Sequence, residues 1–439
     1  MTGVPVPETA RPTSKRGARK ASAQPAVWTD RMLTALETGV KGGVWFSLID
    51  KVYSPINLAA AAKKVIANKG APGVDNVTVQ QYAKYQKRYL EKLGESLRDG
   101  TWQPKAIKRR HIPKPGSAET RPLGIPCVED RVVQTALRNV IEPIFEHEFH
   151  ENSFGFRPGR GCKDALREVD ERLESGDLYV VDADIRKFFD TLCHETLMKR
   201  VEERIADSRI LAMIQRFLEQ EVMEDGGQWT PEEGTPQGGV ISPLLANIYL
   251  NPLDHLMAQH GYTMVRYADD SVIICQSQAE AESALELMRQ WCETNELALH
   301  PEKTCIVDLN QERAGFDFLG YRFQRSRKGG IVRWAGKKAC KRLRERIRPI
   351  TRRANGHSLK TIIAKLAPIL RGWFGYFKES TANGLRTMDS WVRGRLRSIL
   401  RKRQKRKGKG RGLDHRRWPN NYFAKLGLYS LERAQADAS

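Results

Sequence analysis

The sequence predicts an α+β fold, in which a mixed body of helices and antiparallel strands is followed by a helical and strongly basic region. Apolar residues recur at helical spacing over several long stretches, while shorter β-rich runs come in pairs joined by turn residues. The formal charge of +22 is concentrated toward the C-terminal end. A chain of 439 residues also has the length for at least two packed units.

The composition divides the chain into five segments. Residues 1–28 are rich in Pro, Ala and basic side chains and predict a flexible basic tail, whereas residues 29–68 have the apolar spacing of helices. Residues 69–330 predict the mixed body, residues 331–417 the basic helical domain, and residues 418–439 a C-terminal tail.

Individual elements follow from local patterns. Runs rich in β-branched and aromatic residues predict strands over 106–112, 120–125, 178–184, 263–267, 271–275 and 315–323. Helical spacing predicts helices over 30–67, divided at Ser54-Pro55, and over 79–97, 129–149, 243–256 and 337–406. Pro115-Gly116 and Ala268 to Asp270 are the predicted turns of two hairpins.

One block holds most of the positive charge. Between Arg322 and Arg417 there are 32 lysines and arginines against four acidic residues, so the block exceeds the net charge of the whole chain. Such a concentration favours a dedicated site for a large polyanion such as RNA, with a solvated basic face as the alternative.

The cysteine pattern and the lengths of the apolar runs indicate in which cell compartment the protein is expected. The seven cysteines are odd in number and dispersed, which favours reduced thiols over a disulfide framework. No apolar run approaches the length of about 18 residues expected of a membrane span, and residues 1–20 have no signal-peptide core. We therefore expect a cytoplasmic protein without a membrane partner.

Three aspartates suggest metal chemistry. Asp269 and Asp270 stand at the predicted hairpin turn in the segment YADD, and Asp184 closes an apolar run before DIRKFFD. Nucleotidyl transfer uses two Mg²⁺ ions about 3.5–4 Å apart, and Mg²⁺ prefers rigidly held carboxylates. The pattern predicts such a site, with Asp182 on the same strand face as a competing ligand for Asp184.

Seven blocks in a fixed order resemble the group II intron-encoded proteins, a bacterial reverse transcriptase and maturase family. They are KGAPGVDNVT, IPKPGSAETRPLGIPCVEDRVVQ, DADIRKFFDTL, GTPQGGVISPLLANIYLNPLD, VRYADDSVI, HPEKT and FDFLGYRF. The resemblance covers about Trp45 to Ser430 and implies a right-hand polymerase, with fingers and palm in residues 69–330 and a thumb and maturase domain in residues 331–417. Because no Cys/His endonuclease ligands follow, it points to the endonuclease-lacking class C type.

The resemblance assigns roles to individual residues. The implied catalytic residues are Asp184, Asp269 and Asp270, and the implied metal ligands are these three together with Ile185. The implied nucleotide-binding residues are Lys114, Arg121, Phe189 and Gln237. Phe189 would exclude a 2′-hydroxyl, with a place in the core as the alternative. The implied nucleic-acid contacts are Arg157, Arg160, Lys303, Leu319, Gly320, Tyr321, Arg342, Arg344, Arg348, Arg401 and Arg403.

Two further segments, residues 318–321 and the aromatic residues between 373 and 377, have a structural alternative to a nucleic-acid contact. A core strand is the alternative to a primer grip at residues 318–321. For the aromatic residues between 373 and 377, packing in a helix-bundle core is favoured over stacking on bases.

The implied function is RNA-directed DNA synthesis that uses two Mg²⁺ ions, deoxynucleoside triphosphates, an RNA template and a DNA primer or target DNA. The family also binds its own group II intron RNA, assists splicing and supports intron mobility by target-primed reverse transcription. The alternatives are a domesticated reverse transcriptase in phage defence or CRISPR adaptation, and an RNA-binding splicing factor without polymerase activity. The intact carboxylates argue against the last of these.

Overall fold

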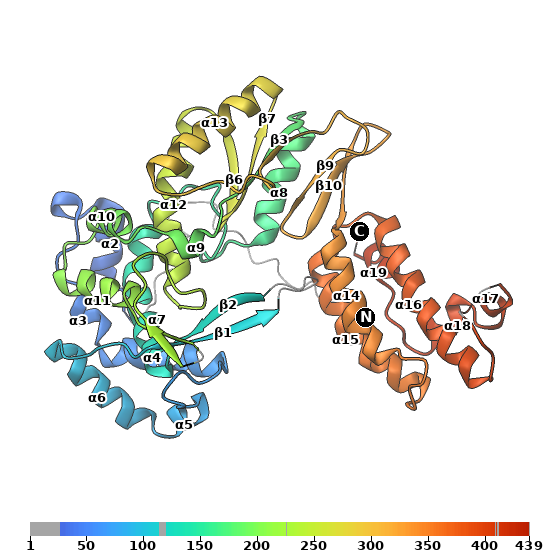
Figure 1. The fold of residues 1–439 in the computed structure, drawn as a ribbon, viewed down its shortest axis with the longest axis horizontal. Helices are drawn as coiled ribbons and strands as arrows, with labels where there is room; N and C mark the ends of the chain where they lie inside the picture. Colours follow the sequence, from blue (N-terminus) through green and yellow to red (C-terminus); the bar gives the residue numbers. More distant parts are fainter. Residues whose placement is uncertain (1–26, 114–119, 225, 409, 411, 439) are drawn as a thin grey trace. The chain divides into compact units, whose positions relative to one another are not determined.

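The computed structural model describes residues 27–113, 120–224, 226–408, 410 and 412–438. The chain divides into two compact units, the first ending at Ile306 and the second beginning at Val307 (Figure 1). This division precedes the boundary at residue 330 that the sequence predicts. The predicted tail lies outside the described residues up to residue 26, as do Lys114 and the turn at Pro115-Gly116.

The first unit contains the predicted helical extension and the part of the predicted mixed body up to residue 306. Its helices are α2 (Asp30–Thr38), η1 (Lys41–Gly43), α3 (Ile49–Val52), α4 (Pro55–Ala67), α5 (Val79–Lys84), α6 (Gln86–Asp99), α7 (Val128–Glu146), α8 (Cys162–Glu174), α9 (Phe188–Thr191), α10 (His194–Glu202), α11 (Ser208–Leu218), α12 (Ser242–Gln259) and α13 (Gln278–Thr294). Its strands are β1 (Ile107–Pro113), β2 (Thr120–Ile125), β3 (Tyr179–Asp184), β4 (Val222–Glu224), β5 (Gly227–Trp229), β6 (Thr263–Tyr267) and β7 (Asp270–Cys275), and β8 (Cys305–Asp308) crosses into the second unit.

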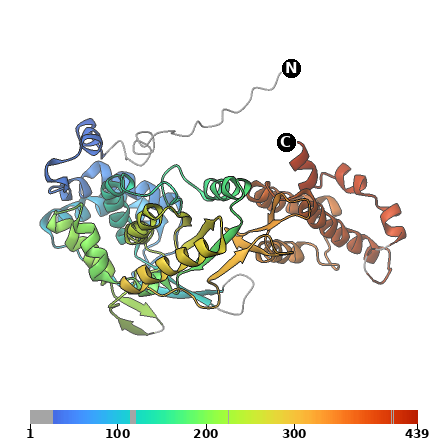
Figure 2. The ribbon, with the colours of Figure 1, turned by 90° about the horizontal axis from the view of Figure 1, so that it is seen from above.

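One sheet forms the platform for the predicted carboxylates. Its strand order is β6-β7-β3-β8, and β7 is antiparallel to both β6 and β3. Helix α13 packs on β3 and β7, while α8 and α12 pack on β6 (Figures 1 and 2). Val181 and Ile273 oppose each other in the register and are fully buried, so apolar packing holds the sheet in place.

A second sheet contains the predicted hairpin of β1 and β2. These strands pair antiparallel from Lys108 opposite Ile125 to Pro113 opposite Thr120, which confirms the prediction. The sheet continues in the order β2-β1-β4-β5. The short strands β4 and β5 are not evident from the sequence, because three residues are too few to show a period.

The N-terminal helices share the core of the first unit. Helix α4 packs on α7, with Leu58 and Ala61 buried against this core. Trp28, at the end of the predicted tail, is also buried, and its indole Nε1 donates a hydrogen bond to the Asn139 carbonyl at 3.0 Å.

The second unit joins an antiparallel sheet to basic helices. It contains β9 (Gly315–Phe318), β10 (Tyr321–Arg325), β11 (Ile331–Ala335), α14 (Lys337–Ile350), α15 (Leu359–Phe377), α16 (Ala382–Arg403), α17 (Leu413–Arg417), α18 (Asn420–Lys425) and α19 (Leu431–Ala436). The prediction of a single strand over 315–323 is wrong. The chain reverses at Leu319-Gly320, where both residues have positive φ angles of 47° and 82°. No described helix has the length and apolar character needed to cross a membrane.

The C-terminal segment belongs to this core and is not a loose tail. Trp418, Phe423 and Leu431 are buried in the same cluster as residues of α14, α15 and α16. Buried Asp389 on α16 accepts hydrogen bonds from the Leu431 amide at 3.0 Å and from the Ser430 hydroxyl at 2.7 Å. The segment is therefore attached by both apolar packing and a buried carboxylate.

Substitution Asp389→Ala is expected to destabilise the second unit by about 1–3 kcal/mol, since it leaves buried donors without an acceptor. Urea unfolding of the full chain measures this change. Asp437→Ala, at an exposed acid beyond α19, is the matched control and should change stability by less than about 0.5 kcal/mol. Equal effects of the two variants would show that Asp389 does not anchor the segment.

Candidate active site

The strand register brings the three predicted aspartates to one end of the first sheet. Asp184, the last residue of β3, lies directly opposite Asp270, the first residue of β7. Asp270 also pairs with Tyr267 of β6, so Ala268 and Asp269 form the turn between these strands. Asp182 pairs with Val272, two residues farther from the turn than the Asp184–Asp270 pair.

The negative charges of Asp184 and Asp269 lie close enough together to change the pKa of Asp269. Burial raises the pKa of Asp269, and the nearby Asp184 carboxylate raises it further, whereas Arg266 and Lys303 act in the opposite direction. The Lys303 ammonium forms an ion pair with the Asp184 carboxylate. Lys303, predicted only as a nucleic-acid contact, therefore lies within the carboxylate site itself.

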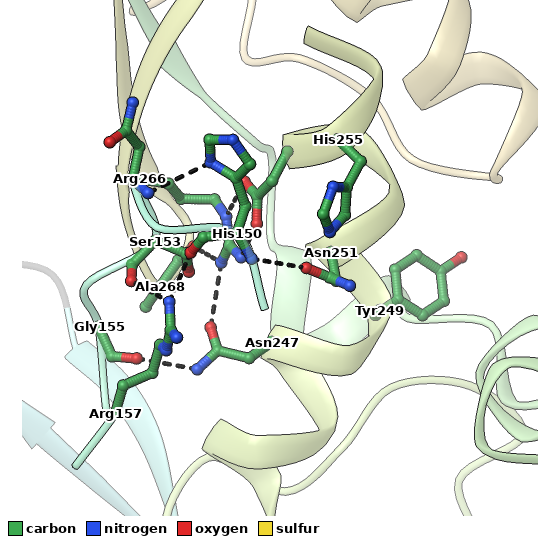
Figure 3. Close-up of polar contacts among 12 residues, drawn as sticks. His150, Ser153, Gly155, Arg157, Asn247, Tyr249, Asn251, His255, Arg266 and Ala268 are labelled. Carbon is green, nitrogen blue, oxygen red and sulfur yellow. Dashed lines mark hydrogen bonds and ion pairs between the residues drawn. The ribbon is translucent and has the colours of Figure 1, made fainter. Parts of the chain in front are cut away.

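The buried Arg266 side chain stabilises the turn between β6 and β7 through hydrogen bonds (Figure 3). Its Nη1 donates to the Ala268 carbonyl at 2.9 Å and to the Asn247 side-chain oxygen at 3.0 Å. Its Nε donates to Asp254 at 2.7 Å, within an ion pair whose two side chains are only 2% and 3% exposed. The buried and fully paired Arg266 side chain thus stabilises the turn. The sequence analysis did not identify Arg266 as a residue of the site. The signal available was a charged residue inside the otherwise apolar strand MVRY.

The segment from Asn152 to Arg160 packs directly against this hairpin. The Arg266 amide donates to the Asn152 carbonyl and the Phe154 amide donates to the Arg266 carbonyl, both at 2.9 Å. Gly155 comes so close that a Cβ there would lie 2.3 Å from the Ala268 nitrogen, so a larger residue would displace the turn.

The structure gives Arg157 a different role from the predicted nucleic-acid contact. Its side chain is 3% exposed and pairs with Glu146 at 2.7 Å, and it also donates to the His150 and Ser153 carbonyls. Arg160 is half-buried, and it donates to the Glu151 carbonyl. Burial withdraws Arg157 from solvent, and therefore from phosphate groups.

The three carboxylates are of the chemical type that a divalent cation such as Mg²⁺ prefers. Among the residues that the structure describes, no three His, Cys, Asp or Glu side chains converge closely enough to hold an ion as they stand. The Lys303 ammonium nevertheless forms an ion pair with Asp184, so this carboxylate already binds a positive charge. The negative charge of Asp184 also raises the pKa of Asp269, so a cation between them would relieve their repulsion. Asp184, Asp269 and Asp270 are the residues that would hold the metal. Ile185 has a buried side chain and forms a bridge with Leu299.

A cavity of about 310 Å³ in the first unit is lined by two of the predicted nucleotide-binding residues. Phe188 is buried in the core, whereas its neighbour Phe189 is half-buried and lines this cavity with Gln237. The Gln237 carbonyl accepts a hydrogen bond from the Gly124 amide of β2 at 2.7 Å. Arg121 is exposed on the same strand.

The predicted primer grip divides into exposed and buried parts. Leu319 and Gly320 form the turn between β9 and β10, and Gly320 is exposed. Tyr321 is fully buried, and its hydroxyl donates to the Tyr376 carbonyl at 2.7 Å. The Tyr376 hydroxyl in turn donates to the Leu319 carbonyl at 2.7 Å. The Tyr321 side chain thus fixes the turn to α15 and is withdrawn from solvent.

The predicted basic contacts of the helices also differ in exposure. Arg342, Arg348 and Arg403 are exposed. Arg344 is half-buried, with its guanidinium 5.9 Å from the Trp391 ring. Arg401 is held by buried Asp414 at 2.7 Å, so part of its charge is used within the fold. Of the four aromatic residues of α15 between 373 and 377, Phe374 and Phe377 are buried, as the favoured core interpretation expects, whereas Trp373 and Tyr376 are half-buried.

Sequence comparison defines the class of protein. Residues 112–323 match the family of reverse transcriptases, RNA-dependent DNA polymerases, and residues 340–418 match the maturase-specific domain of group II introns. The chain belongs to this reverse transcriptase family and is an RNA-directed DNA polymerase that carries a maturase-specific domain.

Individual proteins and solved structures are similar to parts of this chain. Protein YkfC of Escherichia coli (strain K12) is 35% identical over 64% of this chain and 83% of its own length. The group II intron-encoded protein LtrA of Lactococcus lactis subsp. cremoris is 37% identical over 45% of this chain, but the match spans only 33% of LtrA. Among solved structures, telomerase from Candida albicans shares 12% identity over 73% of this chain and 64% of its own, with a TM-score of 0.42.

Substitution Phe189→Val is expected to open space beneath the sugar of the incoming nucleotide. Ribonucleotide incorporation should rise relative to deoxynucleotide incorporation by about ten-fold, which corresponds to about 1.4 kcal/mol in the transition state. Single-nucleotide primer extension with matched ribo- and deoxyribonucleotides measures the ratio. If both substrates slow equally, Phe189 acts only as a core residue.

Proposed function

We propose that Asp184, Asp269 and Asp270 hold two Mg²⁺ ions and catalyse the addition of deoxynucleoside triphosphates to a DNA primer on an RNA template. The observation that carries the proposal is the register that sets Asp184 opposite Asp270 beside the Asp269 turn. Bound Mg²⁺ would supply charge stabilisation for the attacking and leaving oxygens.

Four residues of this chain would bind the incoming nucleotide or select its sugar. Exposed Arg121 on β2 would grip the triphosphate through its planar fork, together with Lys114, which lies outside the described residues. Phe189 would lie under the sugar, and Gln237 would line the same cavity. Lys303 would leave the Asp184 carboxylate when the metal binds, because the two cations compete for one ligand.

We further propose that the second unit binds the group II intron RNA and assists its splicing, and that the two activities together support intron mobility by target-primed reverse transcription. The proposal is supported by the match to the maturase-specific domain and by exposed arginines on α14 and α16. Assignment to the class C type and action in the cytoplasm belong to the same proposal. Free cysteines at all seven positions are compatible with a reducing compartment.

Substitution Asp269→Ala is expected to reduce primer extension by at least about 10³-fold, because the metals would lose a shared ligand. Asp182→Ala is the matched control on β3 and should retain most of the activity. The measurement is primer extension on an RNA template at several Mg²⁺ concentrations. Near wild-type synthesis by the Asp269 variant, or an equal loss in the Asp182 variant, would sink the carboxylate assignment.

Replacing exposed Arg342 and Arg348 by alanine should weaken binding to the cognate intron RNA and slow splicing. Each lost phosphate contact is expected to lower the salt slope of binding by about 0.7–0.9. Arg344 is left in place because it packs near Trp391. The charge-matched control removes exposed Lys87 and Arg88 of α6.

RNA binding at several salt concentrations and a splicing time course with purified precursor RNA measure these effects. Asp269→Ala should stimulate splicing as the unsubstituted protein does. If the unsubstituted protein gives no stimulation on its own intron, the maturase part of the proposal fails while the polymerase part stands.

A further inference from the structure

Phe156 is an exposed aromatic residue beside the turn that carries Asp269. Half of its surface, 50%, is open to solvent, and its ring centroid lies 6.1 Å from that of Tyr267. Tyr267 is the last residue of β6 and directly precedes Ala268 and Asp269. A large and half-exposed apolar ring therefore lies against Tyr267, beside the turn that carries Asp269.

The backbone of Phe156 has an unfavourable conformation. Its φ angle is 56°, in the left-handed region that aromatic residues rarely adopt. Such strain persists only where the surrounding structure imposes it, and it occurs most often at functional sites. Packing of the exposed ring within the protein does not explain why phenylalanine occupies this position.

The residues on both sides of Phe156, Gly155 and Arg157, are held by packing, hydrogen bonds and an ion pair; both are drawn in Figure 3. Before it, Gly155 packs against the Ala268 nitrogen, and the Gly155 carbonyl accepts a hydrogen bond from the Asn247 side chain at 2.8 Å. After it, Arg157 is held by the buried ion pair with Glu146. The segment is thus tied to the same network that supports the turn, so the backbone at Phe156 is held in place relative to that turn.

We propose that Phe156 contacts the primer–template duplex, packing against the sugars and base edges of its minor groove at the end where nucleotides are added. The inference rests on the proposed function, because the carboxylates locate that end of the duplex. The minor groove of an A-form helix is wide and shallow and exposes these groups to a flat side chain. Covering the ring with them would remove apolar surface from water.

The test replaces Phe156 by glycine in the full-length protein. Glycine adopts a positive φ angle without strain, so the melting temperature should stay the same or rise. The affinity for an RNA–DNA primer–template should fall about ten-fold, the effect of burying roughly half of a phenylalanine surface. Fluorescence anisotropy without nucleotides measures this affinity, and thermal unfolding measures stability.

Glu296→Gly is the matched control, since Glu296 is exposed and has a φ angle of 57° at the end of α13. It relieves the same backbone strain but should leave affinity unchanged. The proposal is overturned if Phe156→Gly binds as tightly as the unsubstituted protein, or if its melting temperature falls, since the ring would then serve the fold. Absence of primer–template binding by the unsubstituted protein would instead count against the proposed function.

Discussion

The register of β3 against β7 is the constraint on which the candidate active site depends. Val180 opposes Ile274 and Val181 opposes Ile273, and all four side chains are buried. Because side chains alternate between the two faces of a sheet, a slip of one residue would turn Asp184 away from Asp270. The apolar pattern of two strands therefore fixes the positions of carboxylates that contribute little to the core.

Two buried ion pairs position the segments that pack next to this sheet. Arg266 and Arg157 are each paired with a buried carboxylate, and each also donates to backbone carbonyls. Breaking such a pair leaves an uncompensated charge in the interior, at a cost of about 3–5 kcal/mol. The turn with Asp269 and the segment with Phe156 are consequently positioned by one polar network (Figure 3). Arg157 and Arg266 are thus engaged in internal contacts that stabilise the fold.

Local patterns predicted most elements and the three aspartates, because hairpins, helices and the segment YADD are each contained in a few consecutive residues. The contact of Lys303 with Asp184 joins residues 119 positions apart and has no local signal. The same holds for the burial of Arg157 and Tyr321, which the family resemblance assigned to nucleic-acid contacts. The C-terminal segment shows the converse, since only the long-range contacts of Asp389 and the apolar cluster reveal it as part of a core.

Iron-mediated backbone cleavage tests most directly whether Asp184, Asp269 and Asp270 form a metal site. Fe²⁺ replaces Mg²⁺ in oxygen-ligand sites, and with ascorbate and peroxide it generates hydroxyl radicals that cut the chain near the bound ion. The account predicts cuts close to Asp184 and to the turn at Asp269, suppressed by excess Mg²⁺ and lost in the Asp269→Ala variant. Cleavage at other places, or cuts that persist in that variant, would contradict a metal site formed by these carboxylates.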